Sequence, residues 1–227
     1  MRGCSLLRQG AEVGGVIALL GAESTGKTSL CRALADRLQA DGCSVVVVPE
    51  YLRLWCEAQG RTPRAEEQAD IAAEQDRRIQ AAAVLADWVL ADTTSLMTAV
   101  YSDLLFDDPS LYAPALREQQ RFTLTLLTGL DLPWVADGLL RDGPHVRQPV
   151  DDALRKALAR AAVPYTVVYG HGPHRVDQAL AAVQAVVSAP AVMPSAARWR
   201  WVCADCDDGD CERDHQRDHR RKWLPRA

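Results

Sequence analysis

Short apolar runs alternate along the chain with longer segments in which apolar residues recur at helical spacing. The apolar runs predict buried strands at residues 16–20, 44–48, 88–91, 124–127 and 165–169. The segments between them predict helices at residues 28–40, 65–85, 95–105, 112–121, 150–161 and 175–187. Strands that alternate with helices form a parallel, doubly wound sheet with right-handed crossovers. We therefore expect a three-layer α/β fold with a central parallel sheet.

A change of composition near residue 189 divides the chain into three predicted parts. Residues 1–188 contain every predicted strand and helix and form one α/β domain. Residues 189–197 are rich in Pro and Ala and predict a linker, and residues 198–227 form a tail dense in Trp, Cys, Asp, Arg and His. A doubly wound sheet binds its ligand at the carboxyl ends of its strands, so the residues that follow each strand are the candidates for function.

The segment after the first predicted strand reads GAESTGKT, which is the Gly-x-x-x-x-Gly-Lys-Thr pattern of a phosphate-binding loop (P-loop). In such a loop, backbone N–H groups hold phosphates at the positive end of the next helix. Lys27 would contact the β- and γ-phosphates, and the Thr28 hydroxyl would bind Mg²⁺. The strand and helix on either side argue against a chance Gly-rich turn, so we expect ATP and Mg²⁺ as cofactors. The predicted nucleotide-binding residues are Gly21, Ala22, Glu23, Ser24, Thr25, Gly26, Lys27, Thr28 and Ser29.

Acidic residues follow the second and third predicted strands. Glu50 is a candidate general base that would face the hydroxyl of a phosphoryl acceptor, and the alternative is a solvated loop residue. Asp92 follows four apolar residues, as a magnesium-holding aspartate does, and the alternative is an N-cap for the next helix. Thr93, Thr94 and Ser95 are also able to cap that helix, which favours the magnesium role for Asp92.

Arg141 and Arg147 lie on a Gly- and Pro-rich stretch that precedes a predicted helix. This is the setting of a lid whose arginines stabilise charge on a transferred phosphoryl group, although ordinary surface arginines are an equal alternative. The residue after Asp92 is Thr93, so the Asp-Glu pair with which many ATPases activate water is absent. The chain also contains no asparagine, which excludes the Asn-Lys-x-Asp guanine reader of GTPases. Both observations favour transfer to a hydroxyl over hydrolysis.

Residues 14–187 resemble the ribosylnicotinamide kinase domain of NadR-type proteins. The motifs that carry the resemblance are GAESTGKT, PEYLR at 49–53, ADT at 91–93 with Thr98 and Tyr101, WVADG at 134–138, and VPY at 163–165. The resemblance implies a nucleoside-kinase-like P-loop fold and phosphoryl transfer from ATP to the 5′-hydroxyl of nicotinamide riboside, which gives nicotinamide mononucleotide for NAD biosynthesis. Pro49 stands where family members can carry a tryptophan that sandwiches the nicotinamide ring, and the lid sequence DGLLR at 137–141 is displaced by one residue.

The resemblance also implies an acceptor site next to the P-loop. Glu50 and Arg53 would bind the nucleoside there. Tyr51, Trp55 and Tyr101 are available to stack on a flat cationic ring, although aromatic residues at such spacing usually belong to the core.

The tail contains a second group of residues with possible chemistry. Thiolates and imidazoles are ligands of structural zinc, and a charged tail without metal is the alternative. Five candidates are available for four tetrahedral positions, so the ligand set is open. The candidates are Cys203, Cys206, Cys211, His215 and His219.

Composition limits the partners and the compartment. A net charge of -4 argues against nucleic acid as the main partner. No apolar run approaches the roughly 18 residues that span a membrane, and the amino terminus lacks the apolar core of a signal peptide. Seven cysteines, an odd number, favour reduced thiols. We expect a cytoplasmic protein that acts on a small nucleoside. A kinase for another small hydroxyl substrate and an ATP-binding regulatory protein are the alternatives, and the oligomeric state is open.

Overall fold

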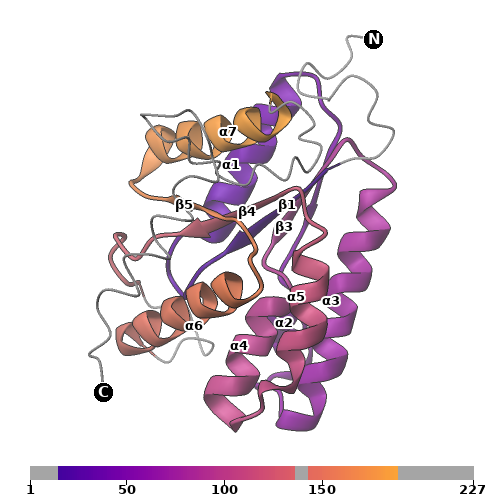
Figure 1. The fold of residues 1–227 in the computed structure, drawn as a ribbon, viewed down its shortest axis with the longest axis vertical. Coiled ribbons are helices and arrows are strands. Elements are labelled where there is room, and N and C mark those ends of the chain that lie inside the picture. Colours follow the sequence, from indigo (N-terminus) through magenta and orange to yellow (C-terminus); the bar gives the residue numbers. More distant parts are fainter. Residues whose placement is uncertain (1–14, 136–142, 189–227) are drawn as a thin grey trace, which may run out of the picture. The chain divides into compact units, whose positions relative to one another are not determined.

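A computed structural model describes residues 15–135 and 143–188 of the chain. Its centre is a parallel sheet of five strands in the order β2-β3-β1-β4-β5 (Figure 1). The strands are β1 (Gly15–Leu20), β2 (Val45–Val48), β3 (Trp88–Asp92), β4 (Leu124–Thr128) and β5 (Thr166–Val168). The chain passes from β1 to β2 and β3 on one side and then to β4 and β5 on the other. The strand order therefore reverses beside β1, and such a switch point creates a crevice at the carboxyl ends of the strands.

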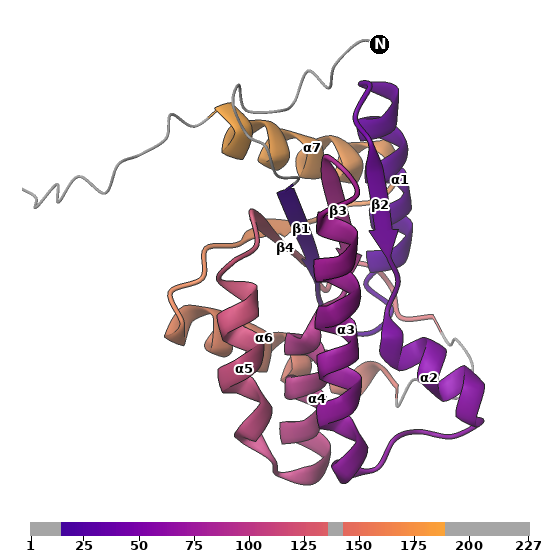
Figure 2. The ribbon, with the colours of Figure 1, turned by 90° about the vertical axis from the view of Figure 1, so that its right-hand side faces the viewer.

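Helices cover both faces of the sheet, which confirms the predicted three-layer fold. On one face lie α1 (Lys27–Ala40) and α7 (Gly172–Ser188), and on the other lie α3, α4, α5 and α6 (Figure 1). These four are α3 (Gln68–Ala83), α4 (Ser95–Phe106), α5 (Tyr112–Gln119) and α6 (Arg147–Arg160). The remaining helix, α2 (Tyr51–Gln59), follows the carboxyl end of β2 and packs beside α3 (Figure 2).

The buried core has one part on each face of the sheet because successive strand residues point to opposite faces. Ile17 and Leu19 of β1 pack with α1 and α7. Leu20 packs instead with α4 and α6. On α1 the buried side chains recur at helical spacing, as its amphipathic pattern predicts, and they are Leu30, Cys31, Leu34, Ala35 and Leu38. This packing fixes the carboxyl end of β1 and the start of α1, between which the candidate phosphate-binding loop lies.

Two elements differ from the sequence prediction. The helix α2 was not predicted; it is only nine residues long and begins two residues after Pro49. It ends at Gly60, whose φ of 65° lies in the left-handed region that favours glycine. The single helix predicted for residues 65–85 is a 3-10 turn, Ala65–Glu67, followed by α3.

Two further observations concern the expected compartment. No helix within residues 15–135 and 143–188 is both long and apolar enough to cross a membrane. Cys31 and Cys56 are buried free thiols. The expected reduced state of the cysteines stays a prediction.

Candidate functional site

The loop between β1 and α1 has the backbone geometry of a phosphate cradle. Gly21 and Gly26 have φ values of 146° and 73°, in the region that side chains disfavour. A Cβ atom on Gly21 would lie 2.0 Å from Oγ1 of Thr128 in β4, so only glycine allows the loop to pass this strand. Since α1 begins at Lys27, the loop lies at the positive end of that helix.

Lys27 holds its ammonium group against the loop backbone. Its Nζ donates to the carbonyl oxygens of Gly21 at 2.8 Å and Ala22 at 2.9 Å. Thr28 is exposed at the start of α1, where its hydroxyl is accessible to a metal ion. Gly21 and Ala22, the first two residues of the loop, are buried and do not line the cavity. The remaining predicted nucleotide-binding residues line a cavity, and they are Glu23, Ser24, Thr25, Gly26, Lys27, Thr28 and Ser29.

Two buried side chains from distant parts of the chain fix Thr25 at the centre of the loop. The Thr25 hydroxyl lies 2.7 Å from that of Thr128 and donates to the carbonyl of Ala22 at 2.8 Å. The carbonyl of Thr25 accepts a 2.7 Å hydrogen bond from Nη2 of Arg175, at the start of α7. Arg175 is 4% exposed and also donates to the carbonyl of Gly170. Burial lowers the pKa of its guanidinium group.

Asp92 lies beside the phosphate loop at the end of β3. It is 6% exposed and pairs in register with Leu19, two residues before Gly21. Burial raises the pKa of the Cys31 thiol and the charge of Asp92 raises it further. The Cys31 Sγ atom of α1 also lies 3.9 Å from the carbonyl oxygen of Leu90 in β3. The N-cap of α4 is Thr94, whose Oγ1 accepts from the Leu96 N–H at 3.3 Å. Asp92 is therefore not needed as a cap.

Thr28 and Asp92 carry the oxygen ligands, a hydroxyl and a carboxylate, with which proteins bind nucleotide-associated Mg²⁺. Mg²⁺ usually takes one or two protein ligands and completes its shell with water and phosphate oxygens. Within the described part of the chain, no three His, Cys, Asp or Glu side chains gather into a larger metal site. A hydroxyl on α1 and a buried carboxylate at the end of β3 are candidate donors, and Asp92 itself is not among the residues that line the cavity.

A cavity of about 610 Å³ extends from the phosphate loop to α2, α3 and α4. Of the five predicted acceptor-binding residues, Glu50, Arg53 and Tyr101 line it. The Arg53 Nε atom lies 3.8 Å from Oε2 of Glu50, so opposite charges are paired on the wall formed by α2. The other lining residues outside the loop are Leu52, Cys56, Thr62, Pro63, Gln68, Leu105 and Phe106.

The two other predicted ring-stacking residues lie outside this cavity. The Arg78 guanidinium is 4.3 Å from the centroid of the Tyr51 ring, and that of Arg61 is 4.8 Å from the Trp55 ring. Neither ring is among the groups that line the cavity. In this structure the two rings contact arginine side chains instead, and their role in stacking on a substrate ring stays a prediction.

Gln75 of α3 connects the two segments that carry the candidate carboxylates. Its Oε1 accepts from the N–H of Tyr51 at 2.7 Å, and its Nε2 donates to the carbonyl of Thr93 at 3.4 Å. Tyr51 directly follows Glu50, and Thr93 directly follows Asp92. Thr93 has a φ of 88°, a strained value for a β-branched residue, so its peptide group benefits from a fixed partner. One buried side chain thus sets the separation of the two segments.

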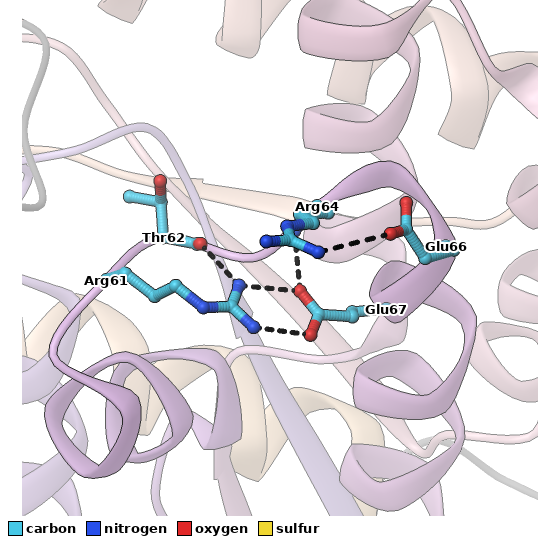
Figure 3. Close-up of polar contacts among 5 residues, drawn as sticks. All are labelled: Arg61, Thr62, Arg64, Glu66 and Glu67. Carbon is cyan, nitrogen blue, oxygen red and sulfur yellow. Dashed lines mark hydrogen bonds and ion pairs between the residues drawn. The ribbon is translucent and has the colours of Figure 1, made fainter.

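An ion-pair cluster lies on the segment that connects α2 to α3 (Figure 3). It consists of Arg61, Arg64 and Glu67, and we call it the Arg61–Glu67 clamp. The Glu67 carboxylate accepts from both terminal nitrogens of Arg61, at 2.7 and 2.6 Å, and from the backbone N–H of Arg64 at 2.8 Å. These hydrogen bonds lower the pKa of Glu67 to about 2, with that from Arg61 contributing most. The clamp holds Thr62 and Pro63, which line the cavity.

The predicted lid arginines have different outcomes. Arg147 is 8% exposed and does not line the cavity. Its terminal nitrogens donate to the carbonyls of Leu132 at 2.9 Å and Leu130 at 3.2 Å, so in this structure it supports the segment after β4. Arg141 lies outside the described residues. The same holds for the predicted zinc ligands Cys203, Cys206, Cys211, His215 and His219.

A second, more apolar cavity of about 560 Å³ lies on the α1 and α7 side of the loop. Gly26 and Ser29 border both cavities. Leu132, His171, Pro173, Arg175 and Val176 form much of the remaining wall. The phosphate loop is therefore flanked by two cavities of different composition.

The sequence matches the family described as "AAA domain" over residues 16–175, which is more than half of the chain. The chain belongs to this AAA-domain family. The family match and the loop geometry agree that this is a P-loop nucleotide-binding domain. A search of the curated proteins gave no match.

Solved structures of NadR proteins are similar to this AAA domain in fold. The crystal structure of a NadR protein in complex with NR has a TM-score of 0.62 and 22% sequence identity, and the match covers 80% of this chain and 53% of that chain. The crystal structure of a NadR protein in complex with NAD and AMP-PNP has a TM-score of 0.62 and 21% sequence identity, and the match covers 78% of this chain and 50% of that chain. The chain thus spans about half the length of these structures. The expected likeness to NadR proteins is confirmed for the fold.

Proposed function

We propose that the chain is a kinase that transfers the γ-phosphoryl group of ATP to the 5′-hydroxyl of nicotinamide riboside. The products are ADP and nicotinamide mononucleotide. The observation that carries the proposal is that Glu50 and the phosphate loop line the same cavity. A hydroxyl bound between them would have a carboxylate to orient it and a phosphoryl group held opposite.

The acceptor would occupy the cavity of about 610 Å³, which is a suitable size for one small nucleoside. Tyr101, Leu105 and Phe106 supply apolar and aromatic surface from α4. Arg53 lines the same cavity, and we propose that it contacts hydroxyl groups of the sugar. The likeness to a NadR protein that was solved with NR supports nicotinamide riboside as the acceptor within this class.

The nucleoside part of ATP would occupy the second cavity. Apolar side chains of Leu132, Pro173 and Val176 offer surface for the faces of a planar base. The cavity shares Gly26 and Ser29 with the acceptor side, so the phosphates would pass along the loop from one cavity to the other. The likeness to a NadR protein solved with AMP-PNP agrees with ATP as the donor.

The reaction assigns a separate role to each residue of the site. The 5′-oxygen forms a bond to the γ-phosphorus, the bond from that phosphorus to the β,γ-bridging oxygen breaks, and Glu50 receives the hydroxyl proton. Lys27 and the loop N–H groups stabilise the charge on the phosphate oxygens. Thr28 and Asp92 would hold Mg²⁺, which supplies further charge neutralisation on the β- and γ-phosphates.

The deciding experiment measures ADP release with nicotinamide riboside, with other nucleosides and without an acceptor. We expect release that depends on nicotinamide riboside. Glu50→Gln should lower kcat by about 10²- to 10⁴-fold and leave the Kd of ATP unchanged, since it removes only the proton acceptor. Glu57→Gln, on the exposed side of α2, is the matched control.

Three other outcomes would overturn parts of the proposal. Turnover with a different nucleoside alone would exclude nicotinamide riboside but keep the kinase class. ATP binding without acceptor-dependent turnover would indicate a regulatory nucleotide-binding protein. Full activity in Glu50→Gln would remove Glu50 from the reaction.

A further inference from the structure

The segment of residues 130–135 follows β4 and lies against the phosphate loop, although it contains neither helix nor strand. A Cβ atom on Gly26 would lie 3.1 Å from Cδ1 of Leu132, so the Leu132 side chain contacts the loop. Leu132 also lines the second cavity. Backbone groups outside helices and strands have no regular hydrogen-bond partners, so the position of this segment depends on contacts from other elements.

Two side chains from different elements supply such contacts. At the start of the segment, the buried Arg147 of α6 donates to the carbonyls of Leu130 at 3.2 Å and Leu132 at 2.9 Å. At its end, the hydroxyl of Ser24 in the phosphate loop accepts from the Val135 N–H at 2.8 Å and donates to the Val135 carbonyl at 3.3 Å. Leu132 therefore lies between two anchored points of the chain.

The backbone of Ser24 indicates that its side chain has a purpose. Its φ of 53° lies in the left-handed region that favours glycine, so a serine here costs free energy that a glycine would not. The contact of its hydroxyl with Val135 is a reason for a serine at this position. Ser24 also belongs to the loop whose backbone N–H groups would hold phosphate. The same residue thus connects the phosphate-binding backbone with the 130–135 segment.

We propose that Ser24 and Arg147 are positioning residues that fix Leu132 as a wall for the base of a bound nucleotide. The inference rests on the proposed placement of the nucleoside part of ATP in the second cavity, and it does not depend on the acceptor. The ligand class that fits is a nucleotide with a planar base, to pack against Leu132, and phosphates to occupy the loop. Arg147 would thus act on the base through Leu132, and not on the transferred phosphoryl group.

The experiment compares a non-hydrolysable ATP analogue with inorganic triphosphate, which has phosphates but no base. Isothermal titration of the full chain with Mg²⁺ gives both Kd values, and their ratio reports the contribution of the base. We expect the wild type to bind the analogue more tightly by about tenfold or more, since the base buries apolar surface. Ser24→Gly suits the left-handed φ and removes the hydroxyl, so it should lower this preference about fivefold, which is the effect of one hydrogen bond. Arg147→Met removes two hydrogen bonds and should lower the preference at least as much.

Two further variants separate positioning from a general loss of structure. Ser24→Asn should keep part of the preference, because asparagine tolerates a left-handed φ and its carboxamide both donates and accepts. Ser44→Ala is the matched control, since the Ser44 hydroxyl also accepts from a backbone N–H at 2.8 Å, that of Asp87, but lines neither cavity. It should bind both ligands as the wild type does.

The ratio of the two Kd values decides the inference. An equal loss of affinity for both ligands in Ser24→Gly and Arg147→Met, or a preference as large as in the wild type, overturns it. A greater loss for triphosphate than for the ATP analogue in Arg147→Met would place this arginine on the phosphates and also overturns it. A wild type without preference overturns the placement of the nucleoside together with the inference, whereas ADP release tests the kinase function separately.

Discussion

The two sides of the phosphate loop are held in different ways. On the nucleotide side, Thr128 and Arg175 reach the loop from β4 and α7 and form buried hydrogen bonds with Thr25. On the acceptor side, buried Gln75 joins α3 to the start of α2, and the rest of the connection between α2 and α3 is held by the Arg61–Glu67 clamp, whose side chains are 40% and 28% exposed. The two sides thus differ in that the acceptor side also relies on solvent-exposed ion pairs.

This difference has a physical basis in the dielectric around each contact. Buried hydrogen bonds leave unsatisfied groups behind when one partner is removed, so their loss is costly. Exposed ion pairs are screened by salt and contribute little to stability. We therefore expect substitutions on the two sides to affect different measured quantities.

The largest effect is expected for Arg175→Met on the nucleotide side. The substitution leaves the buried carbonyls of Thr25 and Gly170 without their donor, which should lower the free energy of unfolding by about 1–3 kcal/mol. The loosened loop should also raise the Kd of ATP about tenfold. Denaturant unfolding and nucleotide titration measure the two effects.

Arg37→Met is the matched control for this prediction. Arg37 also connects α1 to α7, through a 3.0 Å ion pair with Asp177, but both side chains are about half exposed. Its loss should change the free energy of unfolding by less than about 1 kcal/mol. Because Arg37 also lines the second cavity, this control concerns stability and not the Kd of ATP. Equal effects of the two substitutions would contradict the proposed difference between buried and exposed support.

An intermediate effect is expected for Gln75→Met, which disconnects the two carboxylate-bearing segments. We expect kcat to fall about tenfold while the Kd of ATP stays within about twofold, because misplaced catalytic groups impair transfer more than binding. Gln75→Glu keeps an acceptor for the Tyr51 N–H and should restore part of the lost kcat. A parallel loss of ATP affinity and stability would show a general structural role instead.

The smallest effect is expected for Arg61→Met in the clamp. At neutral pH it should raise the KM of the acceptor about two- to threefold, and high salt should do the same to the wild type, because the ion pair is exposed. Steady-state kinetics at two salt concentrations measures this. A change in the Kd of ATP of the same size would mean that the two sides are not independent.

The clamp also gives a pH dependence with a defined sign. Its hydrogen bonds lower the pKa of Glu67 from 4.5 to about 2, so its stabilisation is present above about pH 4.5 and is lost as the pH falls towards 2. Between these values, the unfolding midpoint of the wild type should fall more steeply than that of Glu67→Gln. Identical slopes would show that the clamp is not formed in solution.

The donor half of the site was predictable from the sequence because local backbone requirements determine it. A turn that follows a buried strand and holds phosphate needs glycine at Gly21 and Gly26, and this need leaves a fixed spacing in the sequence. Glu50 and Asp92 became candidates because strand ends in a parallel sheet meet at one edge, and the structure places Glu50 on the cavity wall and Asp92 at the end of β3. The helix α2 was missed although its residues are amphipathic, because it is short and begins two residues after Pro49.

The residues that the sequence did not indicate act through long-range contacts. Arg175 and Thr25 are 150 residues apart, and no local pattern connects them. Gln75 left a weak signal, since it occupies a position on the apolar face of α3 beside Ile71 and Ile79. A glutamine on the buried face of a helix must find a partner, and this signal could have marked the residue.

The phosphate loop separates two cavities whose linings share only Gly26 and Ser29. In evolutionary terms, this arrangement divides the protein into two modules that can diverge separately. Side chains from α2, α3 and α4 can change to admit a new acceptor while the wall around α1 and α7 keeps its nucleotide. Selection for a different acceptor therefore need not lower the affinity for the nucleotide, because the linings of the two cavities share only Gly26 and Ser29.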